Sequence, residues 1–170
     1  MGTITDPMLN EFRQEVATTK RVLERVPEQK LSWKPHAKSM TLGQLASHIA
    51  SVPGSVARIL QQESFDGTQG NFVPPQPKSM QEVLTAFEQS VRDAEQCLLS
   101  MTDDRACEKW RLMRGERELM SLPRISFARS IMMNHWYHHR GQLSVYLRLL
   151  DVPVPSIYGP SADEGPAGMA

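Results

Sequence analysis

Three of the five histidines in this chain lie close together in the stretch NHWYHHRGQL, residues 134–143. Neutral imidazole nitrogens are good ligands for zinc, nickel, copper and iron ions. If the stretch is helical, His135 and His139 stand about 40° apart and share a face, while His138 lies about 60° to the other side of His135. The spacing therefore predicts an inward-facing pair, His135 and His139, with His138 at its edge.

A third ligand for this pair is His48, which falls at the edge of another apolar helical arc, with polar Ser51 and Ser55 on its flank. Three imidazoles leave an ion with positions for water or substrate, which is typical of a catalytic rather than a closed structural site. The alternative is that the buried pair only hydrogen-bonds to backbone or water. The residues alone leave both interpretations open.

The three residues between the pair are Trp136, Tyr137 and His138. No glutamate stands where the HExxH pattern of zinc peptidases needs its general base, so that class of protease is excluded. We assign His138 to a structural or surface role in preference to the pocket. No catalytic residue is identified by these patterns.

Two further residues on the same helix are candidates near the site. Gln142 points close to the direction of His135 and either holds an imidazole tautomer or satisfies a neighbouring helix. Tyr146 lies on the same face, about 10 Å beyond His139 along the axis. A buried tyrosine hydroxyl needs a partner, so Tyr146 is a candidate for the pocket wall.

Four amphipathic patterns position these candidates. Each begins with a helix-start signal: Asp6 before Pro7, capping boxes at Thr41 and Ser79, and Pro123 as a first helical residue. The predicted helices cover residues of about 6–26, 41–62, 79–101 and 123–150. The patterns predict an all-α fold, a four-helix bundle in a single domain over residues 1–170.

The segments between these helices are long. Residues 63–78 span up to about 50 Å when extended, against about 33 Å for a helix of 22 residues. This crossover is therefore long enough to let the second and third helices run parallel. Strand evidence is thin, since charges and a glycine interrupt its best candidate, Trp110–Leu119, which we expect to be a short excursion.

The overall charge is balanced, with 19 Lys and Arg against 19 Asp and Glu. No chain-wide attraction to nucleic acid or anionic lipid is therefore expected. No apolar run approaches the length of a membrane span, and the first residues do not match a secretory signal. We expect a cytoplasmic protein with no nucleic-acid or membrane partner.

Two longer stretches carry a family resemblance. LSWKPHAKSMTLGQLASHIA and HWYHHRGQLSVYLRLLDVPVPSIYGPSADE resemble the DinB/YfiT-like family of bacterial metal-binding helical bundles, including its H-x-x-x-H-R-G-Q-L pattern. The resemblance implies a bundle with a long crossover between helices two and three, and a divalent metal, zinc or nickel, held by His48, His135 and His139. It also implies homodimers and, in characterised relatives, transfer or isomerisation reactions of low-molecular-weight thiols.

The leading hypothesis is a metal-dependent enzyme that activates a thiol cofactor, as a thiol S-transferase or isomerase, for reaction with a small-molecule substrate. Metal-dependent hydrolysis is the alternative within enzymes, although the sequence identifies no base for it. A non-catalytic metal-binding stress-response protein is the alternative outside them. An interaction bundle without a metal is the fourth reading.

Overall fold

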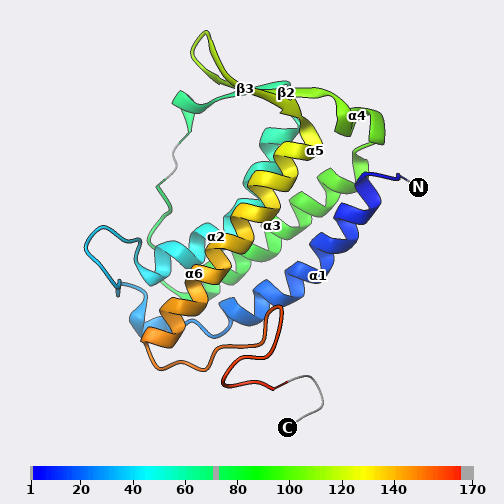
Figure 1. Cartoon of the computed structure of the whole chain (residues 1–170). Helices are drawn as coiled ribbons and strands as arrows, with labels where there is room; N and C mark the ends of the chain where they lie inside the picture. Colours follow the sequence, from blue (N-terminus) through cyan, green and yellow to red (C-terminus); the bar gives the residue numbers. More distant parts are fainter. Residues whose placement is uncertain (1, 71–72, 166–170) are drawn as a thin grey trace.

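The computed structural model describes residues 2–70 and 73–165 and is mostly helical, with a small three-stranded sheet at one end (Figure 1). The four longer α-helices are α1 (Thr5–Leu23), α2 (Leu42–Leu60), α3 (Met80–Ser100) and α6 (His135–Leu149). The shorter helical segments are η1 (Glu28–Lys30), η2 (Gly67–Gln69), α4 (Asp103–Cys107), α5 (Arg124–Phe127) and η3 (Ala128–Asn134). The strands are β1 (Ser64–Asp66), β2 (Lys109–Arg114) and β3 (Arg117–Pro123).

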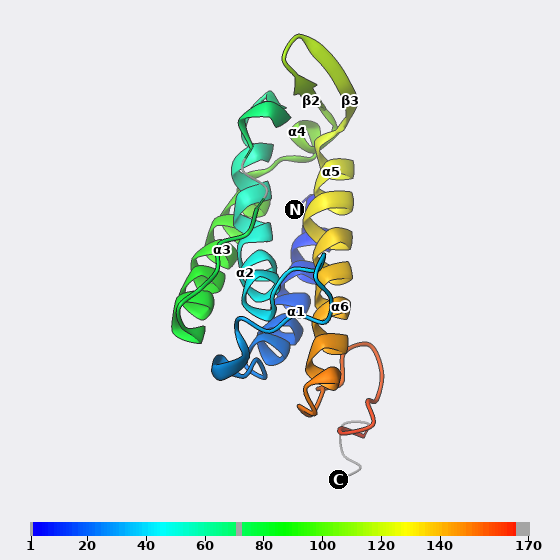
Figure 2. The same ribbon diagram turned by 90° about the vertical axis from the view of Figure 1, so that its left-hand side faces the viewer.

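The long helices lie side by side, with α2 in contact with α3 and α6, and α1 in contact with the same two helices (Figures 1 and 2). Their apolar faces meet in one connected cluster of buried side chains, which includes Phe12, Ile49, Phe87 and Trp136. No helix in the described part of the chain is both long and apolar enough to cross a membrane. That the domain extends over residues 1–170 stays a prediction.

The start of α2 follows the capping box that its sequence predicts. Thr41 Oγ1 accepts a hydrogen bond from the Gln44 backbone N–H, and Gln44 Oε1 accepts one from the Thr41 N–H, at 3.1 and 3.0 Å. Both residues thereby satisfy donors that the first helical turn leaves free. The helix that carries His48 therefore begins at a defined residue.

The start of α1 differs from the prediction. Asp6 lies inside the first turn, and the helix begins at Thr5 without a side-chain cap from its own segment. The carboxylate of Asp103 on α4 instead accepts hydrogen bonds from the backbone N–H groups of Thr3, Ile4 and Thr5. The Thr3 hydroxyl also donates to this carboxylate. With this hydroxyl as the largest cause, the hydrogen bonds lower the pKa of Asp103 to about 2. A cap from a residue so distant in sequence leaves no local pattern to read.

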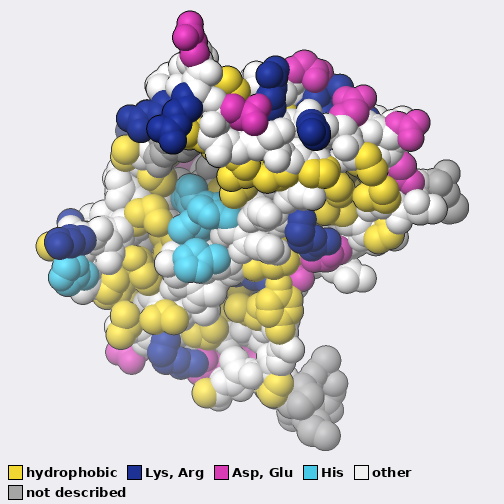
Figure 3. All heavy atoms as spheres, turned by 45° about the horizontal axis from the view of Figure 1, so that its top comes forward, with side chains coloured by type: hydrophobic (Ala, Val, Ile, Leu, Met, Phe, Trp, Pro, Cys, Tyr) yellow, Lys and Arg dark blue, Asp and Glu magenta, His cyan; other side chains and the backbone are white. Residues whose placement is uncertain are grey.

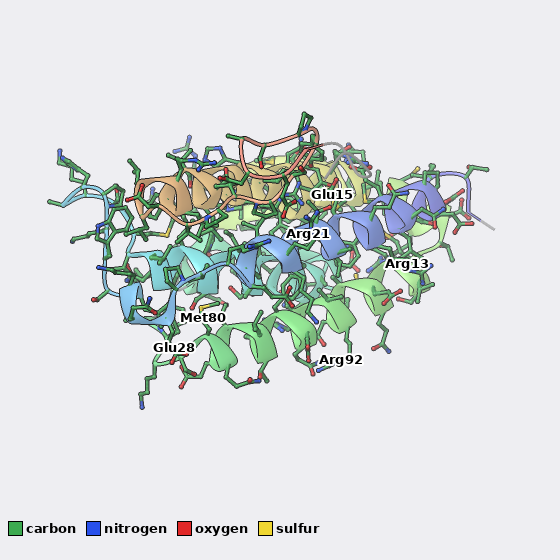
Figure 4. All side chains as sticks on the ribbon, turned by 90° about the horizontal axis from the view of Figure 1, so that it is seen from below. Arg13, Glu15, Arg21, Glu28, Met80 and Arg92 are labelled. Carbon is green, nitrogen blue, oxygen red and sulfur yellow. The ribbon has the colours of Figure 1, made fainter. Side chains whose placement is uncertain are left out.

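The crossover from α2 to α3 returns along the helices, so that α2 and α3 run in the same direction (Figures 1 and 2). At the start of α3 the Ser79 hydroxyl accepts a hydrogen bond from the Glu82 N–H. The Met80 N–H donates to Glu28 of η1, beside it in Figure 4. The end of the crossover is therefore tied both to its own helix and to the segment that follows α1.

The sheet corrects the all-α expectation. The interrupted pattern at Trp110–Leu119 is a hairpin in which β2 pairs antiparallel with β3, and β1 from the crossover adds parallel to β2. The interrupting Gly115 is the turn: its φ of +58° is in the left-handed region that glycine adopts without a steric penalty. The charges follow the exposed positions of the hairpin, while Trp110 is fully buried.

The helix predicted over residues 123–150 is divided. After the short α5, the backbone of η3 takes the wider π-helical path before α6 begins at His135. A π-helical segment changes the angle between residues before and after it, and such segments are frequent at functional sites. The direction of His135 relative to Phe127 is therefore set by η3 and not by a regular α-helix.

Candidate metal centre

The two helices that carry the histidines are joined by a hydrogen bond to a carbonyl group that a proline leaves without its helical partner. Pro53 lies inside α2 and has no N–H, so the carbonyl of Ile49 loses its usual partner within the helix. The indole Nε1–H of the fully buried Trp136 donates to this carbonyl at 2.8 Å. Because Ile49 and Trp136 each follow a histidine, this bond holds His48 of α2 beside His135 of α6.

The side chains of His48, His135 and His139 converge at this junction. His135 Nε2 lies 3.0 Å from His48 Nε2 and 3.1 Å from His139 Nε2. The three rings stand nearly perpendicular to one another, with centroids 4.3 to 5.2 Å apart. The structure thus brings together the three histidines predicted from spacing and resemblance. His48 and His135 are 87 residues apart in the chain.

The surroundings keep all three imidazoles uncharged. Burial, followed by the neighbouring His139 and His135, lowers the pKa of His48 to about 4. Burial is also the first cause that lowers the pKa of His135 and of His139. Neutral imidazole is the form that binds a metal ion, so the site is in its binding form at neutral pH.

Gln142 fixes which nitrogen of His139 carries the proton. Its Oε1 lies 2.8 Å from His139 Nδ1 and accepts the Nδ1–H, which leaves the lone pair on Nε2 directed toward His135. Helical phase alone predicts Gln142 near the direction of His135. The structure pairs it instead with His139, three residues before it on the helix, and supports the role of orienting an imidazole.

The described residues do not complete the hydrogen bonding of these three nitrogens. His139 Nε2 carries no proton and can only accept. If His135 Nε2 carries a proton, that one proton faces both His48 Nε2 and His139 Nε2 and cannot satisfy both. Nitrogens that share one zinc ion at about 2.0–2.1 Å lie roughly 3.3 Å apart, close to the separations found here. The donor set therefore fits a divalent cation, and the group contains no other ligand among the described residues.

Two other candidates, His138 and Tyr146, lie outside this group, as does the remaining histidine of the chain, His36. His138 is exposed, and its ring contacts that of His139, in agreement with a surface role. His36 is exposed in its loop, where its Nδ1 accepts from the Lys38 N–H. Tyr146 does not approach the histidines: its hydroxyl donates to the carbonyl of Met40, and its ring packs against Trp33. Tyr146 therefore contributes to the junction of α6 with the loop before α2.

A cavity of about 340 Å³ begins at His48 and His135 and continues toward the sheet. Figure 3 shows histidine side chains gathered on this face, with hydrophobic side chains beside them. The walls come from α2, from α5 and η3, from the sheet and from the crossover. The lining residues beyond the two histidines are Ser51, Val52, Ser55, Val56, Ile59, Phe65, Val73, Pro74, Pro75, Leu112, Phe127 and Ile131.

Most of these cavity residues were not identified as site residues from the sequence. The flank of His48 with Ser51 and Ser55 was recognised as polar, but nothing local connects it with Phe65 or Leu112. Those two residues reach the cavity only because β1 pairs with β2. The missing hairpin prediction is thus the reason that the cavity was missed.

The neighbour of His139 in sequence, Arg140, points to the opposite side of α6. It is 1% exposed, and its Nη1 donates to Glu15 Oε2 at 2.5 Å and to Thr19 Oγ1 at 3.0 Å, both on α1. Its guanidinium lies over the ring of Tyr137 at 5.2 Å from the centroid. Figure 4 labels Glu15 on α1. This buried ion pair joins α6 to α1 as the histidines join α6 to α2.

Comparisons with known proteins agree with this architecture. The sequence profile of the DinB family matches residues 1–167. The uncharacterized protein YrdA of Bacillus subtilis is 24% identical over 159 residues, covering 94% of this chain and 90% of YrdA.

Two solved structures share the fold. A DinB-like protein from Bacillus cereus has a TM-score of 0.72 at 23% identity, covering 93% of this chain and all of that one. The DinB-like protein YjoA of Bacillus subtilis has a TM-score of 0.69 at 16% identity, covering 89% of this chain and 96% of that one. At these identities the likeness extends to the fold alone.

Proposed function

The chain belongs to the DinB family, and we propose that it is a metal-dependent enzyme in which His48, His135 and His139 hold a divalent cation that activates a thiol cofactor for transfer to a small-molecule substrate. The observation that carries the proposal is the convergence of three uncharged Nε2 atoms. Zinc and nickel are the first candidates, because both accept imidazole ligands.

When bound, a divalent cation lowers the pKa of a coordinated thiol, so that thiolate is available at neutral pH. The chain's own residues supply the remaining conditions. Gln142 holds the His139 tautomer whose Nε2 faces the site, and the Trp136–Ile49 hydrogen bond keeps α6 against α2. The apolar cavity next to His48 and His135 limits the access of water to the reacting atoms.

The donor set favours an open site over a closed one. Three uncharged ligands leave the charge of a divalent cation uncompensated, and no acidic residue belongs to the group in the described part of the chain. An anionic ligand such as a thiolate is therefore favoured at the remaining positions. Hydrolysis at the same site, or metal binding without catalysis in a stress response, are the alternatives. A homodimer and a cytoplasmic location stay predictions.

The proposal is tested on protein purified without a histidine tag. We expect elemental analysis to find about one divalent ion per chain, and transfer of a low-molecular-weight thiol to chlorodinitrobenzene to require that ion. The double variant His135→Ala/His139→Ala should lose both the ion and the transfer activity. His36→Ala, which removes an exposed loop histidine, is the matched control and should retain both.

Stoichiometric metal without any metal-dependent transfer across a panel of thiols and electrophiles would contradict the enzymatic proposal and favour a binding protein. Equal metal content in the double variant and in His36→Ala would contradict the site itself. Chelation followed by re-addition of zinc and nickel in parallel identifies which ion restores the activity.

A further inference from the structure

The cavity beside the histidines has the properties of a substrate site. Its volume of about 340 Å³ is within the range of small-molecule pockets. It opens directly from His48 and His135, so that a molecule bound in it lies next to the atoms proposed to hold the cation. The remaining walls are contributed by four different parts of the chain, which give it a defined shape.

The charge of the walls restricts what can bind. Among the described residues that line the cavity, none is an Asp, Glu, Lys or Arg. Transfer of an ionised group into such surroundings without a partner is strongly unfavourable. The body of the ligand is therefore uncharged.

The two serines add one directional feature. Ser51 Oγ donates to the His48 carbonyl at 3.3 Å, so its proton is already used. Ser55 Oγ accepts a hydrogen bond from Arg58 at 3.2 Å, which leaves its own hydroxyl proton to be donated. The side of the cavity that the sheet contributes is apolar among the described residues, with Phe65 and Leu112. A ligand that fits both sides is apolar and carries one hydrogen-bond acceptor.

We infer that this cavity binds the electrophile of the reaction, and that this electrophile is an uncharged, mostly apolar molecule with one acceptor group facing Ser55. The inference rests on the proposed function for the electrophilic role of the ligand. With a chlorinated nitroarene as the electrophile, the thiolate sulfur forms a bond to the ring carbon, chloride leaves with the electron pair of the carbon–chlorine bond, and the thiol proton passes to solvent.

The test measures binding, so that it does not depend on turnover or on the metal. Metal-free protein is titrated, with fluorine NMR as the readout, against a trifluoromethyl nitrobenzene and the matching trifluoromethyl benzoate. Nitro and carboxylate groups are similar in shape and differ in charge. We expect the neutral compound to bind at least tenfold more tightly than the anion.

Variants locate the binding. Leu112→Asp places a charge in the cavity at a partly exposed strand position and should weaken binding of the neutral compound at least tenfold. Ser55→Trp fills the same space and should do the same, which covers the case in which one variant does not fold. Val145→Asp adds the same charge on the exposed side of α6, where Val145 is 57% exposed, and should leave binding unchanged.

Equal affinity for the two compounds would overturn the inference, as would unchanged binding by folded Leu112→Asp and Ser55→Trp proteins. Selective binding of the neutral compound supports the cavity as a site even if no metal-dependent thiol transfer is found. In that outcome the proposed function fails and the binding site does not. Transfer activity without selective binding of the neutral compound would support the proposed function and overturn the inference about the cavity.

Discussion

His139 and Arg140 are neighbours in sequence, both are buried, and they serve opposite sides of α6. On the α1 side, the charge of Arg140 is matched by Glu15 within the chain. On the α2 side, the imidazole of His139 faces two other imidazoles and no charged group in the described part of the chain. A buried charge that serves structure is paired within the chain, although Arg140 Nη2 has no hydrogen-bond partner among the described residues. The histidine group has no acidic partner in the described part of the chain, and its completion by a bound cation stays a prediction.

Arg124 of α5 is a second buried cation whose charge is paired within the chain, although its Nε has no hydrogen-bond partner in the described residues. It is fully buried, and it donates to the carbonyls of Leu60 and Gln62 at the C-terminal end of α2 and to the carboxylate of Glu63. Carbonyls at that end of a helix lack partners, so a buried cation suits them. Arg124 therefore fixes α5 to α2. The contrast between buried arginines that are paired with carboxylates and the histidine group thus rests on two arginines, Arg124 and Arg140.

The largest effect is expected from breaking the Arg140–Glu15 ion pair on the α1 side of α6. Arg140→Met should lower the free energy of unfolding by about 3–5 kcal/mol, because it leaves the Glu15 carboxylate without its partner in a mostly buried position. The measurement is urea unfolding followed by circular dichroism. Arg13→Met, which breaks the exposed pair of Arg13 with Glu95, should change the stability by less than about 1 kcal/mol.

The double variant Arg140→Met/Glu15→Leu sharpens this prediction. It removes both charges and should recover most of the stability lost in Arg140→Met, because a buried ion pair and well-packed apolar residues are often of similar stability. If the double variant is as unstable as Arg140→Met alone, packing and not the unpaired charge is responsible.

A smaller effect is expected from replacing Gln142, which lies on the histidine side of α6. Gln142→Leu removes the acceptor that holds the His139 tautomer and should weaken metal binding by about 10- to 100-fold. Gln142→Glu keeps an acceptor at the same place and should bind at least as tightly as the unmodified protein. Competition with a metal-sensitive dye measures both. Identical affinities for the Leu and Glu variants would show that Gln142 does not act through the imidazole.

The smallest effect is expected on the stability of the metal-free protein when the pH is lowered. The pKa of His48 is about 4 in the folded chain and near 6.5 when unfolded, so below pH 6.5 the unfolded chain binds more protons. Stability of the metal-free protein should therefore fall as the pH falls from about 6.5 to 4, by about 1–2 kcal/mol once solvent screening is allowed for. Urea unfolding at several pH values measures this loss.

His48→Asn should reduce the loss between these pH values, and His36→Ala should not. Added metal should steepen the dependence on pH, because protons then compete with the ion for the same nitrogens. An unchanged pH dependence in His48→Asn would contradict the role of His48 and assign the acid sensitivity to other groups, such as His135, His139 and the carboxylates.

The helices and the histidine group were accessible from the sequence for a physical reason. Helical periodicity and capping residues are local, and the spacing of His135 and His139 places them on one face whatever the rest of the chain does. The resemblance then connected that pair to His48. The metal role of the three residues stays a prediction.

The remaining features depend on contacts between distant residues. The sequence places no local signal on the Asp103 cap of α1, the pairing of β1 with β2 or the π-helical path of η3. Gly115 was read as an interruption because a turn inside a short, charged hairpin resembles a broken strand. The helical phase placed Gln142 near the pair but does not tell which of the two rings turns toward it, and the structure pairs it with His139.

The Trp136–Ile49 hydrogen bond also has a consequence for folding. It joins residues 87 positions apart, as does the contact of His48 with His135 beside it. Contacts of such long sequence separation form late, after the loop-closure entropy of the intervening chain has been overcome. During synthesis, residues up to His139 must have emerged before the three imidazoles can meet. Uptake of a cation by all three histidines would therefore mark a chain whose helices have already docked.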